Sequence, residues 1–293
     1  MLFPLFSFLC GMALASVKGH AQLKTVLSTL LAKILIPFVI IYNMVFYQEG
    51  HLALIALSIL AAVSLYALYV LLFKDRLQAL CCSYTNIGWL GLPIAMSIFG
   101  SEVSGAMIAL YIGGSLFGNI WATSAVSQTA QPPLVMIKGL LRSPPVIALC
   151  IAAILRVLGV DHMAHHALMD WAYLVSKWGM SFAGMCVLGM WLRHTRVNVT
   201  DLILSSKIAL FKLLCGALFC LVVYLFIEND AIHQSIAVIF LLFCLPPAAN
   251  IVALETHYQG TGTSAKYIAA GTIVSCVVIV LYAALWYLFG SRV

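Results

Sequence analysis

The sequence predicts an all-α polytopic membrane protein with about ten transmembrane (TM) helices, and three observations predict it. Of 293 residues, 64% are hydrophobic and only 8% are charged, and the mean hydropathy is +1.09, a composition outside the range of soluble domains. Apolar windows about 20 residues long, the length of a membrane-crossing helix, follow one another along the chain. Short links join these windows, and no segment has the composition of a soluble domain or a long linker.

The predicted spans, numbered 1 to 10, cover residues 2–17, 26–47, 52–73, 78–99, 104–127, 139–159, 167–192, 203–227, 232–256 and 266–289. No basic residue precedes span 1 and Lys18 follows it, which predicts an uncleaved helix with its N-terminus outside. Lysine and arginine gather in the links after odd-numbered spans, whereas the links after even-numbered spans carry mainly acidic residues. The positive-inside rule therefore predicts a multi-pass protein of the cytoplasmic (inner) membrane with both termini outside.

The composition also limits partners and cofactors. The net charge of +6 does not indicate a nucleic-acid partner, because the basic residues are scattered and form no patch. The nine cysteines lie almost wholly inside apolar windows without the spacing of metal ligands, which is typical of buried thiols. No phosphate-binding loop or Ser-His-Asp arrangement is present. We therefore expect no cofactor, no metal and no enzymatic activity, and the lipid bilayer is the first expected partner.

Ten spans divide into two units of five, residues 1–128 and 129–293. Because five is odd, the second unit enters the membrane from the opposite side, so the two units are expected to form an inverted repeat. Two landmarks correspond between the units. Spans 4 and 9 are both interrupted, and Lys33 in span 2 matches Lys177 in span 7.

The interruptions in spans 4 and 9 are the main functional signal. Residues 81–93 (Cys-Cys-Ser-Tyr-Thr-Asn-Ile-Gly-Trp-Leu-Gly-Leu-Pro) contain two glycines that weaken a helix and a proline that removes a backbone donor. Residues 245–250 (Leu-Pro-Pro-Ala-Ala-Asn) interrupt span 9. Irregular backbone at membrane depth is tolerated only where it is buried in protein or lines a wet cavity. Interrupted helices in matching positions of two halves indicate a transporter substrate site.

An inverted repeat would make the two broken helices cross near the midplane, each presenting the N-terminus of its second half-helix to the centre. Such an end carries a partial positive charge and free amide donors, which suit a carboxylate. The amides of Asn86 and Asn250 could serve the freed backbone, a ligand or both, and the sequence leaves these roles open. Tyr84, Trp89, Tyr111 and Asn119 are expected to line the site.

Residues 86–93 resemble the Asn-x-Gly-aromatic-x-Gly-x-Pro signature of the auxin efflux carrier family, which includes plant auxin exporters and bacterial malonate and malate carriers. Residues 245–250 are similar to the family's second signature, Pro-Pro-Ala-Ala-Asn, and Pro144-Pro145 also fit. The resemblance covers essentially the whole chain. It departs from the family in span 7, where many relatives have a proline and this chain reads Lys-Trp-Gly-Met-Ser at residues 177–181.

The resemblance implies an elevator-type carrier. Spans 1, 2, 6 and 7 would form a scaffold, which is often dimeric in this family, and spans 3–5 and 8–10 would form a mobile transport unit. The substrate would be held at the crossover of spans 4 and 9. The residues that the resemblance places at this site are Asn86, Gly88, Gly91, Pro93, Pro246, Pro247 and Asn250.

Ionisable residues inside spans are candidates for function. Lys33, Lys177 and Lys212 each fall about a third of the way into a span, from where a lysine stem reaches the interface by snorkelling, the simpler interpretation. The alternative is that Lys33 and Lys177 attract an anionic substrate to the two mouths of the pathway. No acidic residue falls near the centre of a span. Glu255 is closest and is expected at the cytoplasmic end of its half-helix, so the coupling ion is not predicted.

One histidine cluster suggests a different chemistry. Residues 162–166 (His-Met-Ala-His-His) resemble one metal-binding box of membrane di-iron oxygenases. A single box does not complete the coordination of a redox metal, so a solvated outer loop is the simpler interpretation. The sequence thus predicts a carrier that moves a small mono- or dicarboxylate by alternating access. The alternatives are a membrane-embedded metal-dependent enzyme that uses His162–His166 and a non-transporting ligand sensor on the same fold.

Overall fold

A computed structural model describes residues 2–46, 50–126, 134, 138–139, 141–160, 167–193, 196–252, 255 and 263–289. Helices dominate these residues, and among them the only β pairing is an isolated bridge between Thr85 and Pro247. Five helices in the described ranges are long and apolar enough to cross a membrane: His20–Val45, His51–Phe73, Ser101–Ala122, Val199–Phe226 and Ser264–Phe289. The chain is therefore an all-α protein with the apolar helices of a membrane protein. The count of ten spans, the inverted repeat and the orientation stay predictions.

The helices in chain order are α1 (Leu2–Leu14), α2 (His20–Leu30), η1 (Leu31–Leu35), α3 (Ile36–Val45), α4 (His51–Phe73), α5 (Arg76–Ser83), η2 (Ile87–Gly91), α6 (Leu92–Phe99), η3 (Ser101–Val103), α7 (Ser104–Val126), α9 (Pro144–Val157), α10 (Ala167–Arg193), α11 (Val199–Phe226), α12 (Asp230–Gln234), α13 (Ile236–Cys244) and α15 (Ser264–Phe289). The elements η1 and η2 are π-helices and η3 is a 3₁₀-helix. Each predicted span holds at least one of these helices.

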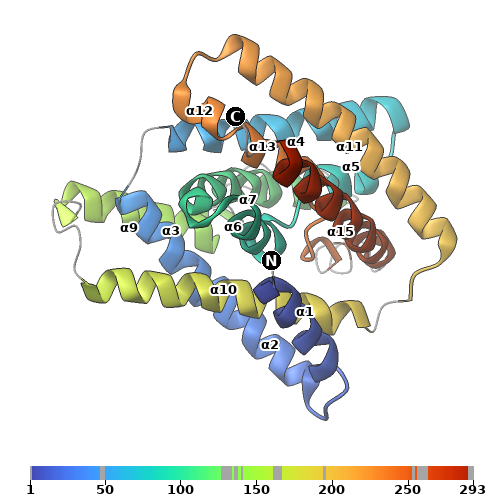
Figure 1. Ribbon diagram of the computed structural model, residues 1–293, viewed down its shortest axis with the longest axis horizontal. Coiled ribbons are helices and arrows are strands. Elements are labelled where there is room, and N and C mark those ends of the chain that lie inside the picture. The colour runs from blue at the N-terminus through green and yellow to red at the C-terminus, as the bar shows by residue number, and fades with distance from the viewer. Residues whose placement is uncertain are drawn as a thin grey trace.

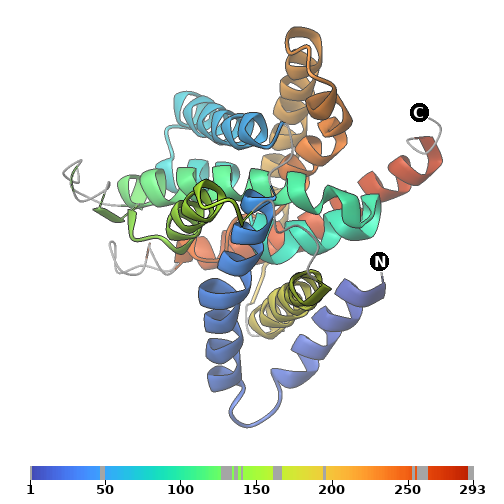
Figure 2. The same ribbon diagram turned by 90° about the vertical axis from the view of Figure 1, so that its left-hand side faces the viewer.

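The helices pack in two groups. In the first group, α1 packs against α10, α3 against α9, and α2 and α3 against α10. In the second group, α4 packs against α5 and α7, and α11 against α13 and α15. Figure 1 shows α1, α2 and α10 on one side of α6 and α7, with α11, α12 and α13 on the other. The same order holds when the molecule is turned by 90° (Figure 2). The element η2 contacts both α10 and α7 and so lies between the groups.

Glycines let the backbones of α1 and α10 come into direct contact. A Cβ added at Gly11 would lie 2.1 Å from the carbonyl oxygen of Cys186, and one at Gly189 would lie 2.2 Å from that of Phe8. Close crossings through glycine are typical of helices that associate in a membrane, where dispersion contacts replace the hydrophobic effect. In the first group, α1 and α10 are therefore in direct backbone contact.

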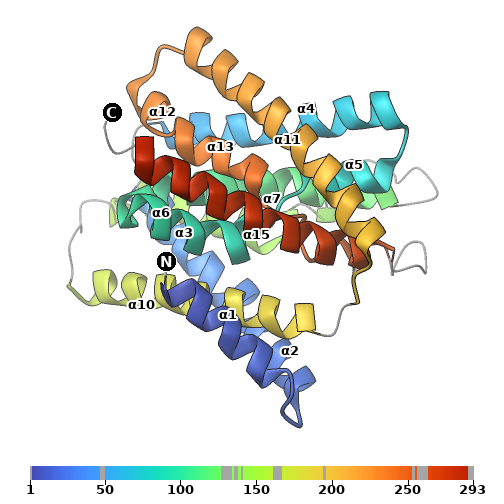
Figure 3. The ribbon, with the colours of Figure 1, turned by 45° about the vertical axis from the view of Figure 1, so that its right-hand side comes forward.

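The outward faces of α11 and α15, which lie side by side in Figure 3, carry exposed apolar side chains. On α11 these include Leu210, Leu214, Leu218, Leu221 and Leu225, and on α15 Val277, Val280, Leu281, Leu285 and Leu288. A continuous apolar surface of this kind needs an apolar environment. A bilayer would provide one.

The helix α5, which leads into the interruption of span 4, begins at a well-formed cap. The Asp75 side chain accepts a hydrogen bond from the Gln78 backbone amide at 2.9 Å. We expect Asp75→Ala to lower the free energy of unfolding by about 1 kcal/mol, because one amide of the first turn loses its acceptor. Denaturant titration in detergent micelles measures the change. Asp75→Asn keeps an acceptor and should stay near wild type, and equal losses in the two variants would contradict this role.

Candidate functional site

The interruptions of the two helices lie against each other. The first break, residues 84–86, follows the end of α5, and the second break, residues 245–249, follows the end of α13. The Asn86 backbone amide donates to the Pro246 carbonyl at 2.9 Å, and the Ala248 amide donates to the Tyr84 carbonyl at 2.8 Å. Thr85 and Pro247 form an antiparallel bridge between these two bonds. Each break thus provides hydrogen-bond partners for the backbone that the other leaves open.

Two consecutive prolines fit this pairing for a simple reason. The pairing uses the carbonyl of Pro246 and the amide of Ala248, and it asks for no donor from Pro246 or Pro247. Proline lacks only the amide donor and keeps its carbonyl. The Pro-Pro-Ala sequence therefore ends α13 while leaving the groups that bind the first break in place.

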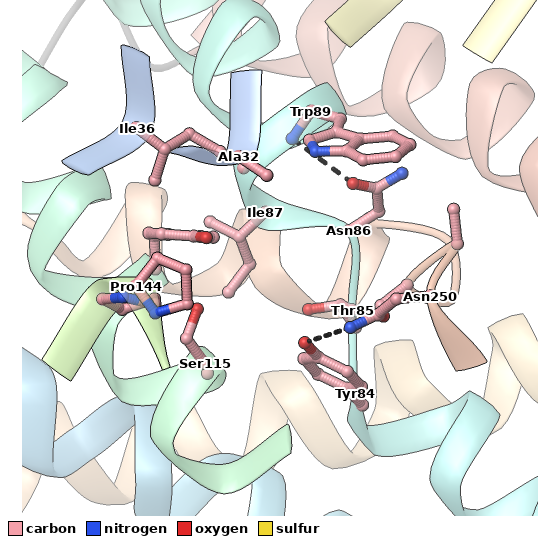
Figure 4. A pocket seen from close by; sticks show the side chains of 16 residues that line it. Ala32, Ile36, Tyr84, Thr85, Asn86, Ile87, Trp89, Ser115, Pro144 and Asn250 are labelled. Carbon is pink, nitrogen blue, oxygen red and sulfur yellow. Dashed lines mark hydrogen bonds between the residues drawn. The ribbon is translucent and has the colours of Figure 1, made fainter. Parts of the chain in front are cut away.

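Asn86 caps the helix that restarts after the first break. Its Oδ1 accepts from the Trp89 backbone amide at 3.3 Å, and its backbone carbonyl accepts from the Gly91 amide at 3.0 Å, which closes a π-helical turn. Because a backbone amide only donates, Oδ1 must face it, and Nδ2 points away from the Trp89 amide (Figure 4). Nδ2 is buried and has no hydrogen-bond partner among the described residues. A buried donor without an acceptor is costly, so it calls for a ligand oxygen.

Asn250 joins the two breaks through a side chain. Its Nδ2 donates to the Tyr84 hydroxyl at 3.0 Å (Figure 4). The Tyr84 ring packs closely on Gly118 of α7, where an added Cβ would lie 2.3 Å from the ring carbon Cζ. The sequence left the role of Asn250 open. Its amide bonds a tyrosine of the first break, and Asn250 itself is exposed.

A cavity of about 220 Å³, the crossover cavity, adjoins the paired breaks (Figure 4). It is lined by Ala32, Ile36, Tyr84, Thr85, Asn86, Ile87, Gly88, Trp89, Tyr111, Gly114, Ser115, Pro144, Pro145, Ala248, Ala249 and Asn250. None of these lining residues carries a formal charge. The cavity brings together Asn86, Gly88 and Asn250 of the predicted site, with Tyr84, Trp89 and Tyr111. Gly91, Pro93, Pro246 and Pro247 do not line it. The side chain of Asn119 lies outside the described part of the chain.

Gly88 and Gly91 do not interrupt the helix, which corrects the sequence interpretation. They leave room for side chains of neighbouring segments. The break lies before both glycines, at residues 84–86, and residues 87–99 form a continuous apolar helix from η2 into α6. A Cβ at Gly88 would lie 2.7 Å from the ring carbon Cε2 of Tyr111. One at Gly91 would lie 2.7 Å from Cδ1 of Leu245 in the second break. The glycines therefore let the restarted helix approach α7 and the second break closely.

Two helix N-termini meet the crossover cavity. Asn86 precedes the helix of residues 87–99, and Pro144 and Pro145 begin α9. Pro144 and Pro145 have no amide hydrogen, and the Ile87 and Trp89 amides already donate to Thr85 and Asn86, so these two ends act chiefly through the partial positive charge of the helix dipole. The electrostatics of the cavity therefore favour a negatively charged group without any cationic side chain in its lining.

Lys212 has a role that the sequence interpretation missed. It is buried on α11 and donates from Nζ to the Leu245 carbonyl at 2.5 Å, at the point where α13 ends. The expectation of snorkelling is wrong for Lys212 and for Lys177, since both side chains are buried in the protein. Lys33 is exposed on η1 and does not line the crossover cavity, although its neighbour Ala32 does.

Glu255 is fully buried, and its carboxylate caps the start of α15. It accepts hydrogen bonds from the backbone amides of Thr263 at 2.8 Å and Ser264 at 2.7 Å, and from the Ser264 hydroxyl. A carboxylate at a helix N-terminus is well matched to the helix dipole. This acidic residue therefore stabilises the second half of the chain.

His162–His166 lie outside the described residues. Asp170, which follows them on α10, accepts a hydrogen bond from the Tyr42 hydroxyl at 2.6 Å. Within the described part of the chain, no group of three or more His, Cys, Asp or Glu residues is placed to hold a metal ion.

The chain matches no protein-family model and no curated protein. The likeness of residues 86–93 and 245–250 to the auxin efflux carrier signatures therefore stays a prediction from motifs.

Proposed function

We propose that the protein is a membrane carrier for a small organic anion, a mono- or dicarboxylate, held at the paired breaks. One observation carries this proposal. The Nδ2 donor of Asn86 is buried without a partner, next to a cavity that two helix N-termini meet. A carboxylate oxygen is the acceptor that both features favour. The cavity of about 220 Å³ suits an anion of a few carbon atoms.

The lining of the cavity supports binding rather than chemistry. Its polar side chains are Tyr84, Thr85, Asn86, Tyr111, Ser115 and Asn250, and none of these lining residues is a carboxylate, histidine or thiol. General acid–base catalysis relies chiefly on such groups. A site made of amide and hydroxyl donors is suited to bind an anion and release it unchanged.

The position of the cavity supports movement of the ligand. Ile36, Pro144 and Pro145 come from the first group of helices, and Ala32 comes from η1, which joins α2 to α3 of that group. The other lining residues come from the two breaks and Asn250 beside them, from η2, and from α7 of the second group. A ligand in the cavity therefore touches both groups. In this proposal ten spans form inverted repeats over residues 1–128 and 129–293, and the second group carries the anion past the first, which serves as the scaffold and the dimer contact. The resemblance to auxin efflux carriers points the same way.

A transport assay tests the proposal. The purified full chain in proteoliposomes should take up labelled malonate or malate saturably, and the same anion should raise its thermal unfolding temperature in detergent. Asn250→Ala should weaken binding about tenfold, because Tyr84 loses the hydrogen bond that holds it against the cavity.

The control is Asn229→Ala. Asn229 is an exposed asparagine that caps α12 by accepting from the Ile232 amide at 3.1 Å, remote from the crossover cavity. Its variant should bind the anion as wild type does. Binding without uptake would indicate a sensor. The absence of both for a panel of malonate, malate and indole-acetate would overturn the carrier proposal.

A further inference from the structure

A second cavity, of about 400 Å³, lies between the end of α3, the starts of α4 and α7, and α10. It is separate from the crossover cavity. The helix α3 contributes Ile36 to the crossover cavity and Asn43 to the second cavity, seven positions and therefore about 10 Å further along the helix. Between these positions α3 carries Val39 and Ile40, and both are fully buried. An apolar layer thus divides the two cavities.

The wall of the second cavity is a preformed network of hydrogen bonds. The Tyr173 hydroxyl lies 3.2 Å from Oδ1 and 3.1 Å from Nδ2 of Asn43, and 3.2 Å from Oγ of Ser104. The Tyr173 ring stacks on that of Tyr42 with centroids 4.0 Å apart, and the Tyr42 hydroxyl donates to Asp170 at 2.6 Å. These side chains come from α3, α7 and α10, and they hold one another in place.

Lys177 differs from the other polar residues of this wall. Its side chain lines the second cavity and is only 7% exposed. Its ammonium group lies 5.0 Å from the centroid of the Tyr173 ring, and no ion pair or hydrogen bond joins it to another described residue. A cation–π contact offsets only part of the cost of removing an ammonium group from water. The Glu102 carboxylate lines the same cavity and attracts the ammonium group without contacting it, so the position in direct contact with the ammonium is open to an anion.

We propose that the second cavity is a ligand site for a small monocarboxylate, with Lys177 as its counter-ion. The carboxylate pairs with the Lys177 ammonium, and the fixed hydroxyl and amide groups of Tyr173, Asn43 and Ser104 surround the rest of the solute. This site goes beyond the carrier proposal and does not depend on it, because the two proposals rest on different cavities. Where the carrier proposal also holds, the second cavity gives the anion a binding position about 10 Å along α3 from the crossover cavity.

Glu102 sets the charge of the preferred ligand. This exposed residue on η3 lines the same cavity and makes no ion pair with Lys177. Its carboxylate repels a second negative charge on the solute, while a neutral or positive end is tolerated. The site should therefore bind propionate more tightly than malonate, which has a carboxylate in place of the methyl group.

The test is calorimetric titration of the full chain in detergent with propionate and with malonate. Lys177→Met should weaken propionate binding at this site at least tenfold, because it removes the counter-ion and keeps a similar side-chain length. Glu102→Gln should strengthen malonate binding about threefold, because it removes a partly screened repulsion. A purely structural role of Lys177 would not predict the gain in Glu102→Gln. Unchanged propionate affinity in Lys177→Met, or the absence of any gain in Glu102→Gln, would overturn the proposal.

A second measurement covers the case in which Lys177→Met does not fold. Propionate should slow acetylation of Lys177 in the wild-type chain by an amine-reactive ester, measured by peptide mass spectrometry. Lys207 is the internal control, because it is exposed on α11 and does not line this cavity. Equal rates at Lys177 with and without propionate would overturn the proposal. Protection of Lys177 that persists in Asn86→Ala separates this site from the crossover cavity, whatever the outcome of the transport assay.

Discussion

We expect Asn86→Asp to weaken anion binding at the crossover cavity about a hundredfold while leaving the paired breaks in place. Aspartate keeps the oxygen that accepts from the Trp89 amide and caps a helix as well as asparagine does. It replaces the buried Nδ2 donor with a second oxygen, so the anion loses a hydrogen bond and gains a negative neighbour. A hydrogen bond to a charged group contributes about 1.5–3 kcal/mol, and a hundredfold change in affinity corresponds to about 2.7 kcal/mol.

Titration calorimetry with malonate measures the loss, and malonate uptake into proteoliposomes should fall with it. Asn229→Asp is the matched control, because it makes the same chemical change at another helix cap, where Asn229 accepts from the Ile232 amide. That variant should bind and transport as wild type does. Wild-type affinity in Asn86→Asp would remove the observation on which the carrier proposal rests.

The place where the two breaks meet could be predicted from the sequence because its causes are local. Proline lacks an amide donor and its ring clashes with the preceding helical turn, so two consecutive prolines inside an apolar span, Pro246 and Pro247, are expected to interrupt its helix. Backbone freed at membrane depth needs a partner, and a second interrupted segment is the one the sequence offers. Asn86 and Asn250 could be singled out because an amide beside such a break has nearby groups to bond.

The exact position of the first break could not be predicted in the same way. The sequence interpretation placed it within residues 81–93 and attributed it to Gly88, Gly91 and Pro93, since glycine weakens helices and proline removes an amide donor. Those glycines instead make room for Tyr111 and Leu245, which belong to α7 and to the second break. Whether a glycine ends a helix or permits a close approach depends on a neighbour that is distant in sequence.

Contacts between residues distant in sequence also explain why the sequence did not predict the roles of Tyr42, Asp170 and Lys212. Tyr42 and Asp170 are 128 positions apart, and Lys212 and Leu245 are 33 apart. Hydropathy describes each lysine only by its depth in its own span, and at that depth snorkelling is the ordinary outcome. The fold instead turns Lys177 toward a cavity and Lys212 toward a carbonyl. No sequence pattern within their helices distinguishes the buried Lys177 and Lys212 from the exposed Lys33.

We expect Lys212→Met to lower the free energy of unfolding by about 1–3 kcal/mol, because the Leu245 carbonyl then stays buried without a donor. Methionine matches the length of lysine closely, so the change removes the ammonium group and leaves little empty space. Two effects oppose each other here. Burying the ammonium of Lys212 costs desolvation energy, and its bond to Leu245 offsets that cost. We expect the hydrogen bond to outweigh the desolvation cost. The Leu245 carbonyl at the end of α13 needs a donor, and no side chain of the second break provides one.

Denaturant titration in micelles decides between the two effects. Lys207→Met, at an exposed position on the same helix, is the matched control and should change stability by less than about 0.5 kcal/mol. A gain in stability in Lys212→Met would show that the desolvation cost is the larger of the two. Because Leu245 also packs on Gly91, loosening of the second break should reach the restarted helix as well. Anion affinity should therefore fall in Lys212→Met and stay unchanged in Lys207→Met, which links this buried lysine to the crossover cavity without any direct contact.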